Sequence, residues 1–297
     1  MTTTLQTVVS RPQPSGVLGP MLQLSKPGVT RLVMVTALCG ALVAPLGIDV
    51  VNLVVALLST ALVVAGANSL NMFLERDVDA RMERTRFRPL PSGRVSTEFA
   101  LGFGLCSSVL GLFLLTALVN LVAATLAGLA LLSYVLVYTP LKRSTPLALH
   151  VGAVPGALPP LIGYAAVTGR LDAPAYALAA ILLVWQLPHF MAIAIFRQHE
   201  YSAAGLKVYP VVHGIPRTRR AIVIYSAVLL AVSLLPLPLG IAGWPYAVVA
   251  VLSGLTFLVW SLRGLSTPNV VSWARSLFLA SMPYLVILFT ALVASAM

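Results

Sequence analysis

Long apolar segments recur from one end of the chain to the other, and they restrict the possible folds more than any other feature. The segments lie near residues 29–47, 51–74, 98–118, 121–139, 147–168, 174–195, 219–238, 245–262 and 274–296. An apolar run of about 20 residues spans the hydrocarbon core of a bilayer as a helix. Spanning β-barrels are built from shorter segments of alternating polarity, whereas these runs are continuous. The sequence therefore predicts an all-α polytopic membrane protein with nine transmembrane helices.

Charged residues are scarce and unevenly distributed. They make up 9% of the chain, whereas a soluble domain carries about 25%. If the N-terminus is cytoplasmic, the N-terminal tail and the loops near 75–97, 140–146, 196–218 and 263–273 face inward. Apart from Arg170, every Lys and Arg lies in these regions or at their margins, as the positive-inside rule requires. The net charge of +11 therefore reports membrane orientation, and nucleic acid is not an expected partner.

The N-terminal segment differs from the rest of the chain in being polar. Residues 1–24 are predicted to form a disordered cytoplasmic tail, and residues 25–297 a single transmembrane domain. The tail lacks the apolar core of a secretory signal peptide. Its only base is Arg11, which favours the plasma (inner) membrane of a bacterium over the mitochondrial inner membrane. Cys39 and Cys106 lie in apolar segments without a CxxC motif, so neither a disulfide framework nor covalent haem attachment is indicated.

A stripe of oxygen-bearing side chains ends the second apolar segment. Asn71, Glu75 and Asp79 are spaced i, i+4 and i+8, which places them on one helical face, while Asp77 points away. A carboxamide and two carboxylates are ligands for a hard divalent cation, and Mg²⁺ suits them because it shares its coordination sphere with phosphates. The alternative is a solvated helix end whose acids pair with neighbouring arginines. The stripe begins inside the apolar helix, which a solvated end does not require.

An arginine-rich loop follows the stripe. Arg84, Arg86 and Arg88 occupy alternate positions before Pro89 and Pro91. Alternation before prolines favours an extended segment whose guanidinium groups fan toward a phosphate. The alternative is a charge run that only fixes orientation in the membrane. Such a run needs no preference for arginine over lysine, yet every base of this loop is arginine.

A second polar region lies at the end of the sixth apolar segment. Gln186, His189, Arg197 and Glu200 fall within one arc of a helix, which Pro188 is expected to kink. Polar groups on one face of a membrane helix indicate a cavity wall. We therefore expect a further metal carboxylate from Glu200 and a diphosphate contact from Arg197. The alternatives are a helix-packing histidine and a surface ion pair between Arg197 and Glu200.

Two further segments carry weaker signals. The loop at 138–146 is short and basic, and its Lys142 and Arg143 either contact phosphate or anchor the topology. The fifth apolar segment contains several glycines and prolines between residues 152 and 163. Such a helix packs closely against its neighbours or breaks where a ligand needs space.

These motifs resemble the UbiA superfamily of intramembrane prenyltransferases. Asn71-x3-Glu75-x3-Asp79 with the string from Arg84 to Gly93 is similar to the first aspartate-rich motif of that superfamily. The supporting strings are Lys26-Pro27-Gly28, Tyr138 to Arg143, Gly152 to Gly163, Pro188-His189-Phe190, Glu200-Tyr201-x3-Gly205 and Pro210-Val211-Val212. Pro188-His189-Phe190 and the fifth-segment string make the chain most similar to the subfamily of protohaem IX farnesyltransferases, the haem O synthases.

The resemblance implies a fold, a reaction and a set of site residues. Nine helices surround a central cavity, which opens to lipid and is capped by cytoplasmic loops. A farnesyl group passes from farnesyl diphosphate to a vinyl group of protohaem, giving haem O and diphosphate. Joined to the residue patterns, this assigns Mg²⁺ to Asn71, Glu75, Asp79 and Glu200, and places His189 deeper, facing the haem. The diphosphate would contact Arg84, Arg86, Arg88, Lys142, Arg143 and Arg197. A downstream haem A synthase or oxidase assembly factor is a possible partner within the lipid bilayer.

The chain departs from the family pattern at two positions, and its residue patterns also fit other functions. Glu75 and Glu200 stand where the family usually has aspartate, and the longer side chain puts the metal preference in question. A prenyltransferase for an aromatic quinone precursor such as 4-hydroxybenzoate is the alternative within the same class. A transporter of an anionic lipid or metabolite is disfavoured because transporter sites lie near the bilayer midplane. A purely structural membrane subunit leaves the acidic stripe unexplained.

Overall fold

The computed structural model describes residues 18–45, 47 and 49–296, and every regular element in these residues is a helix. The helices are α1 Leu18–Leu24, α2 Pro27–Leu42, α3 Val50–Asp79, α4 Thr97–Leu114, α5 Leu121–Leu132, α6 Thr139–Leu141, α7 Ala148–Thr168, α8 Ala173–Phe196, α9 Gln198–Ala203, α10 Tyr209–Val232, α11 Trp244–Arg263 and α12 Val270–Ala296. Two π-helices, η1 Leu115–Val119 and η2 Ser133–Tyr138, prolong α4 and α5. The all-helical expectation is thus confirmed for the described residues.

Seven helical stretches of this part of the chain are long and apolar enough to cross a membrane. They are Val50–Asp79, Thr97–Val119, Leu121–Leu141, Ala148–Thr168, Ala173–Phe196, Trp244–Arg263 and Val270–Ala296. The apolar helix α2 is shorter, and α10 carries three arginines in its first half. The count of nine spans and the inward N-terminus therefore stay predictions.

Helix ends differ from the apolar segments where proline intervenes. Helix α2 ends at Leu42, whereas the first apolar segment was expected to continue to about residue 47, because Pro45 follows closely. Helix α10 runs over Tyr209–Val232, whereas the apolar segment was expected at 219–238. Prolines after position 235 turn the chain there, so apolar character continues beyond the helix.

The predicted disordered tail is wrong for its last seven residues. Residues 18–24 form α1, and Leu24 at its end is fully buried. Leu24 packs in a small apolar cluster with Met72 of α3, Leu90 and Ala100. This contact holds α1 against α3 and α4. Residues 1–17 lie outside the described part.

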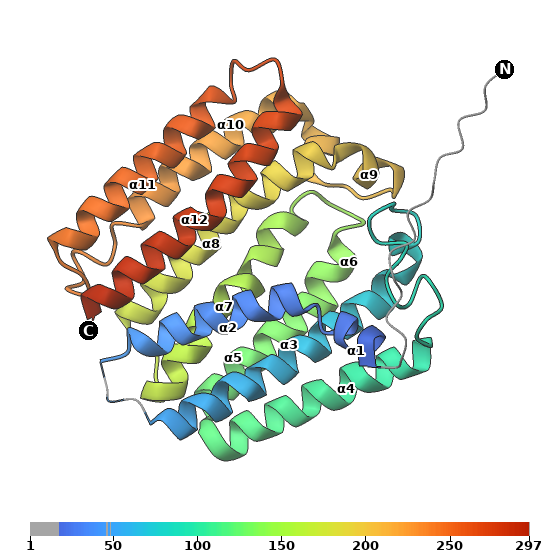
Figure 1. Ribbon diagram of the computed structural model, residues 1–297, viewed down its shortest axis with the longest axis horizontal. Helices are drawn as coiled ribbons and strands as arrows, with labels where there is room; N and C mark the ends of the chain where they lie inside the picture. Colours follow the sequence, from blue (N-terminus) through green and yellow to red (C-terminus); the bar gives the residue numbers. More distant parts are fainter. Residues whose placement is uncertain (1–17, 46, 48, 297) are drawn as a thin grey trace.

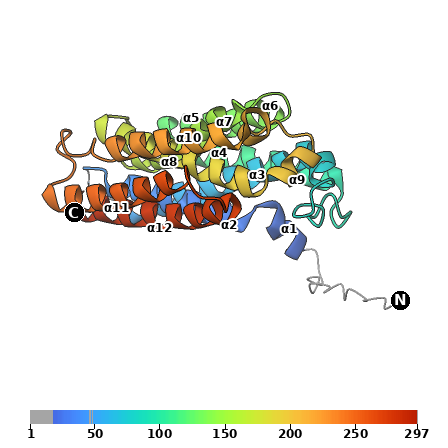
Figure 2. The same ribbon diagram turned by 90° about the horizontal axis from the view of Figure 1, so that it is seen from above.

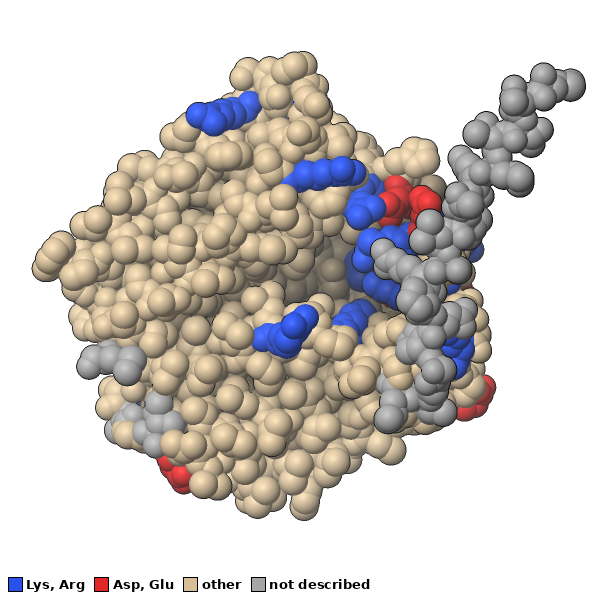
Figure 3. Space-filling view, in the orientation of Figure 1, with Lys and Arg blue, Asp and Glu red and all other residues tan. Residues whose placement is uncertain are grey.

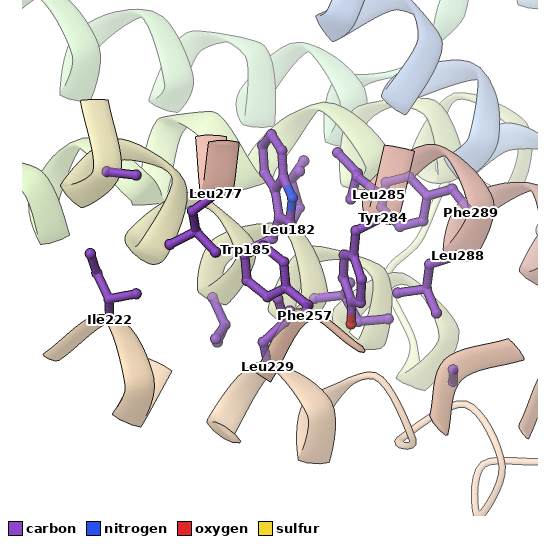
Figure 4. Packing of buried hydrophobic residues seen from close by; sticks show 14 of the residues in the cluster. Leu182, Trp185, Ile222, Leu229, Phe257, Leu277, Tyr284, Leu285, Leu288 and Phe289 are labelled. Atoms are coloured by element: carbon purple, nitrogen blue, oxygen red, sulfur yellow. The ribbon is translucent and has the colours of Figure 1, made fainter. Parts of the chain in front are cut away.

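The helices form a bundle whose long axes run roughly alongside one another (Figure 1). Figure 2 shows α2, α11 and α12 in a layer on one side of the bundle, with α5, α7 and α10 on the other. The largest apolar cluster joins α8, α10, α11 and α12. Figure 4 shows its packing, with Trp185 of α8, Leu229 of α10, Phe257 of α11 and Tyr284 of α12 close together. A second cluster joins α3, α5 and α7.

Glycines bring α2 and α7 into close contact. A Cβ atom added to Gly163 of α7 would lie 1.7 Å from the carbonyl oxygen of Ala37, and one added to Gly40 of α2 would lie 2.0 Å from that of Pro160. Backbone therefore meets backbone across this interface, as small residues permit in membrane helices. Helix α7 continues through its three prolines from Ala148 to Thr168. Of the two outcomes expected for this segment, close packing is confirmed.

Replacing Gly163 by alanine is expected to destabilise the protein by about 1–3 kcal/mol, because α2 and α7 must separate to admit the methyl group. The measurement is the thermal unfolding midpoint in detergent. Gly102→Ala in α4 is the matched control, since a Cβ atom there has no neighbour within 4 Å. Equal midpoints for the two variants would contradict the close approach of the helices.

Candidate active site

A cavity of about 710 Å³ lies at one end of the bundle, between the ends of α3, α8 and α12 and the loops beside them. Figure 3 shows it as a hollow in the molecular surface, with blue Lys and Arg side chains gathered around it. All three lysines of the chain, Lys26, Lys142 and Lys207, line this cavity. Apolar side chains from several elements, among them α7, α8 and α12, also line it. The cavity thus has a strongly cationic part and an apolar part.

The acidic stripe of α3 faces this cavity. Asn71, Glu75 and Asp79 line it, with relative exposures of 1%, 7% and 1%. Asn71 Nδ2 donates hydrogen bonds of 3.0 Å to Glu75 Oε2 and to Thr139 Oγ1. The Asp77 side chain, by contrast, is 68% exposed. The helical spacing therefore correctly predicted that Asn71, Glu75 and Asp79 share one face of α3 and that Asp77 lies on another.

Three cations contact this stripe. Lys142 Nζ lies 2.7 Å from Glu75 Oε1, and Arg88 Nη1 lies 2.6 Å from Asp79 Oδ2. Lys26 Nζ donates a 2.7 Å hydrogen bond to Asn71 Oδ1. Each oxygen-bearing side chain thus has a positive partner that also lines the cavity. Acids and bases are held within reach of one ligand.

Lys26 was not among the sequence-predicted site residues. It precedes α2 in a left-handed backbone conformation, with φ of 47°. Burial lowers the pKa of its ammonium group to about 7, and the charges of Arg88 and Lys142 act in the same direction. An incoming anion would offset these effects and favour the charged form. The available signals were its position directly before the first apolar segment and the string Lys26-Pro27-Gly28, which gave it no role in the site.

The arginine loop does not have the extended conformation expected from its alternating pattern. Residues 80–95 form successive turns, with the Arg86 amide bonded to the Met82 carbonyl and the Arg88 amide to the Thr85 carbonyl. The fully buried Thr85 holds the loop against α3 by donating to the Asp79 carbonyl at 2.8 Å.

Because the loop is coiled, the arginines that reach the cavity are four residues apart in the sequence. Arg84 and Arg88 line the cavity, whereas Arg86 is exposed and lies over the ring of Phe87. Arg143 does not line the cavity either, and its guanidinium donates to the Leu74 carbonyl at 3.0 Å. The structure therefore places four of the six predicted diphosphate residues at the cavity: Arg84, Arg88, Lys142 and Arg197.

The polar face of α8 only partly reaches the cavity. Arg197 lines it and pairs with Glu200, which does not. Gln186 is buried and donates to the carbonyl oxygens of Ala153 and Leu182. Helix α8 continues through Pro188, which lies within it.

His189 is also buried away from the cavity lining. Its Nδ1 lies 2.7 Å from Ser281 Oγ, and its ring stacks on Trp185 at a centroid separation of 4.6 Å. The ring also lies 4.9 Å from that of Phe278, a residue of the cavity wall. In this structure His189 packs α8 against α12 and supports the wall from behind.

The carboxylates of the two polar regions do not form one cluster. In residues 18–45, 47 and 49–296, no group of three or more His, Cys, Asp and Glu side chains could hold a metal ion. Glu75 and Asp79 share the cavity, but Glu200 lies on α9 and is neutralised by Arg197. The expected four-ligand set with Glu200 is therefore not preassembled.

Tyrosines at the cavity were also missed. Tyr134 and Tyr138 line it from η2, and the Lys142 ammonium lies 4.6 Å from the Tyr138 ring centroid. A π-helix shifts side-chain direction relative to an α-helix, and such segments are frequent at functional sites. Helical periodicity alone could not place these rings in the cavity. Tyr201, Lys207, Tyr209 and Arg275 complete the unexpected polar lining.

The sequence matches a known protein family and is similar to named members of it. The model of the UbiA prenyltransferase family matches residues 33–282. The chain is 53% identical over 245 residues to the protoheme IX farnesyltransferase of Sorangium cellulosum, covering 82% of this chain and 88% of that one. It is 45% identical over 281 residues to the protoheme IX farnesyltransferase of Anaeromyxobacter dehalogenans, covering 95% of each.

Solved structures share the fold at low sequence identity. One is digeranylgeranylglyceryl phosphate synthase, with a TM-score of 0.80, 20% identity and coverage of 94% of this chain and 98% of that one. Another is a UbiA homologue from Archaeoglobus fulgidus bound to GPP and Mg²⁺, with a TM-score of 0.63, 17% identity and coverage of 92% and 99%.

Proposed function

The chain belongs to the UbiA prenyltransferase family, and on this basis we propose that it transfers the farnesyl group of farnesyl diphosphate to a vinyl group of protohaem IX. The products are haem O and diphosphate, and water supplies the hydroxyl group of the new side chain. The two relatives described above carry this activity in their names. The observation that carries the proposal is the cavity, where acids and cations meet at one end of an apolar chamber.

The oxygen donors of α3 fit a magnesium ion. Asn71, Glu75 and Asp79 offer amide and carboxylate oxygens, the donor type that Mg²⁺ prefers, and the fold is shared by a homologue bound to Mg²⁺. When bound, Mg²⁺ would hold the diphosphate and withdraw charge from it as the allylic C–O bond breaks. Glu200 would contribute mainly by orienting Arg197, because their ion pair occupies its carboxylate.

The cations of the cavity are proposed to bind the diphosphate. Lys26, Arg88 and Lys142 now contact the acidic stripe, so their side chains already reach the place where a metal-bound diphosphate would lie. Arg84 and Arg197 line the same space. Arginine suits phosphate because its fork donates two parallel hydrogen bonds, and lysine supplies a point charge. These groups stabilise the charge that the leaving diphosphate acquires.

The apolar part of the cavity is proposed to hold the prenyl chain and the acceptor. Phe190, Ile193, Phe196 and Phe278 line it from α8 and α12. Such walls limit the access of water to the allylic cation until the vinyl group has reacted with it. His189 would act on this region through Phe278, against which it packs.

Mass spectrometry of haems extracted from a haem O-deficient bacterium, with and without this protein, tests the proposal. We expect a protein-dependent haem heavier than protohaem by a farnesyl group and a hydroxyl group. Membranes supplied with labelled farnesyl diphosphate and either protohaem or 4-hydroxybenzoate identify the acceptor. Label appearing only in the benzoate product would contradict the proposal and favour a quinone-precursor prenyltransferase.

A further inference from the structure

Arg275 is a cation of the cavity that no acid neutralises in the described residues. It is the sixth residue of α12, about 8 Å along the helix from its start. It is exposed, lines the cavity and takes part in none of the five ion pairs of this region of the chain. The reaction proposed above gives this residue no role at the diphosphate.

Its position differs from that of an arginine that merely extends toward the membrane surface. Arginine within a membrane helix is costly unless its head reaches water or a polar cavity. The Arg275 guanidinium carbon lies 5.8 Å from the ring centroid of Phe196, a residue of the cavity wall. Arg263 of α11 lies over Trp260 at 5.7 Å in the same way, but neither of these residues lines the cavity. Stacking on an aromatic ring alone therefore does not bring an arginine to the cavity.

The cavity wall beside Arg275 is aromatic. Phe196 of α8 and Phe278 of α12 are 5.8 Å apart in an edge-to-face arrangement, and Phe190 lines the same wall. Aromatic and apolar surfaces of this kind suit a flat, polarisable ring system. A guanidinium at the border of such a wall suits a carboxylate attached to that ring system, because the two form paired hydrogen bonds.

The cations that contact the acidic stripe, Lys26, Arg88 and Lys142, belong to other elements than Arg275. They come from the start of α2, the loop after α3 and the loop after α6, whereas Arg275 comes from α12. Arg197 lies 5.6 Å from the same Phe196 ring as Arg275, but Glu200 neutralises it, so Arg275 is the cation of this pair that has no acid partner in the described residues. Farnesyl diphosphate has one anionic end, which the cations at the acidic stripe accommodate. Protohaem has two propionate groups on the edge of the ring that lies away from its vinyl groups. The only anionic groups left for Arg275 in the two substrates are therefore the propionates.

We propose that Arg275 binds a propionate carboxylate of the tetrapyrrole acceptor. The macrocycle then lies against Phe196 and Phe278, and its vinyl edge is directed across the cavity toward the diphosphate end. This assignment rests on the proposed function and names the residue that recognises the polar edge of the acceptor. Arg275 thereby orients the acceptor without contacting the bond that breaks.

Steady-state kinetics with protohaem and with its dimethyl ester test this assignment. We expect Arg275→Gln to raise the KM for protohaem about tenfold, as loss of a charge-assisted hydrogen bond predicts. The KM for farnesyl diphosphate should change by less than about twofold, which also reports that the variant is folded. Wild-type protein should bind the ester more weakly than protohaem, and Arg275→Gln should bind the two acceptors equally. Arg275→Lys keeps the charge but not the paired hydrogen bonds, so its affinity for protohaem should lie between those of the glutamine variant and the wild type.

Arg263→Gln is the matched control, because it removes an arginine stacked on an aromatic ring outside the cavity. Absorbance titration of each protein with protohaem gives the affinity without turnover. An unchanged affinity for protohaem in Arg275→Gln, an equal loss for protohaem and its ester, or an equal loss in Arg263→Gln would overturn the assignment alone. Wild-type protein that neither binds nor farnesylates protohaem would overturn the proposed function, and the role of Arg275 with it.

Discussion

Replacing Asp79 by asparagine is expected to slow farnesyl transfer by two to three orders of magnitude, on the order of the loss when one electrostatic group of an active site is removed. Asp79 is buried to 1% exposure, faces the cavity and holds Arg88. The neutral side chain would no longer offset the charge of a divalent ion, so the Mg²⁺ concentration for half-maximal rate should also rise. Initial rates of haem O formation in reconstituted vesicles, measured across a Mg²⁺ series after EDTA treatment, give both quantities.

Asp77→Asn is the control for this experiment. It removes the same charge two residues away, from a side chain that is 68% exposed and only 3.9 Å from Arg76 in a surface pair. Its rate and Mg²⁺ dependence should match the wild type within about twofold, because exposed ion pairs contribute little. Equal losses in the two variants would show that net charge at the helix end matters, and not the face of α3. A loss in Asp79→Asn without a change in Mg²⁺ dependence would contradict the ligand role.

The acidic stripe could be recognised from sequence because two constraints act on the same few residues. An apolar helix fixes the period of its side chains, and ionisable groups are too costly in a membrane to be placed there without partners. Asn71, Glu75 and Asp79 satisfied both constraints, and the structure brings them to one cavity. The same reasoning set Asp77 aside.

Other site residues were not predictable in this way because tertiary contacts determine their positions. The arginine loop coils because the buried Thr85 holds it against Asp79, a contact that no local pattern announces. Gln186 and His189 do lie within the predicted helix α8. Helix α12 packs against part of this helix, so His189 hydrogen-bonds to Ser281 and does not line the cavity. Lys26 enters the cavity through a backbone conformation that is rare for lysine.

The ends of the helices were also only partly predictable from the sequence. Continuous apolar runs locate the helices, yet they do not show where proline ends a helix before the apolar run does, as after Leu42. Leu24 illustrates the opposite error, since a polar segment still contributes a buried anchor through one residue. Hydropathy averages over a window, whereas packing depends on single side chains.

Replacing Arg88 by glutamine is expected to raise the KM for farnesyl diphosphate and lower kcat, together reducing kcat/KM by about two orders of magnitude, because a phosphate-binding fork is lost. The KM for protohaem should change little, since Arg88 lies at the cationic end of the cavity, beside Asp79. Arg86→Gln is the matched control: this arginine, two residues away, lies over Phe87 outside the cavity, so near wild-type kinetics are expected.

A structural role for Arg88 leads to a different result. Arg88→Gln leaves the carboxylate of Asp79 buried without its 2.6 Å partner, which by itself lowers the thermal unfolding midpoint. If Arg88 served only that ion pair, Arg88→Lys would restore both stability and kinetics, and the KM for farnesyl diphosphate would follow the midpoint. If Arg88 binds diphosphate, Arg88→Lys keeps the charge and the stability but not the paired hydrogen bonds, so its kcat/KM should lie between those of glutamine and arginine. Comparing the midpoint with the KM for farnesyl diphosphate across the three side chains therefore separates the two roles.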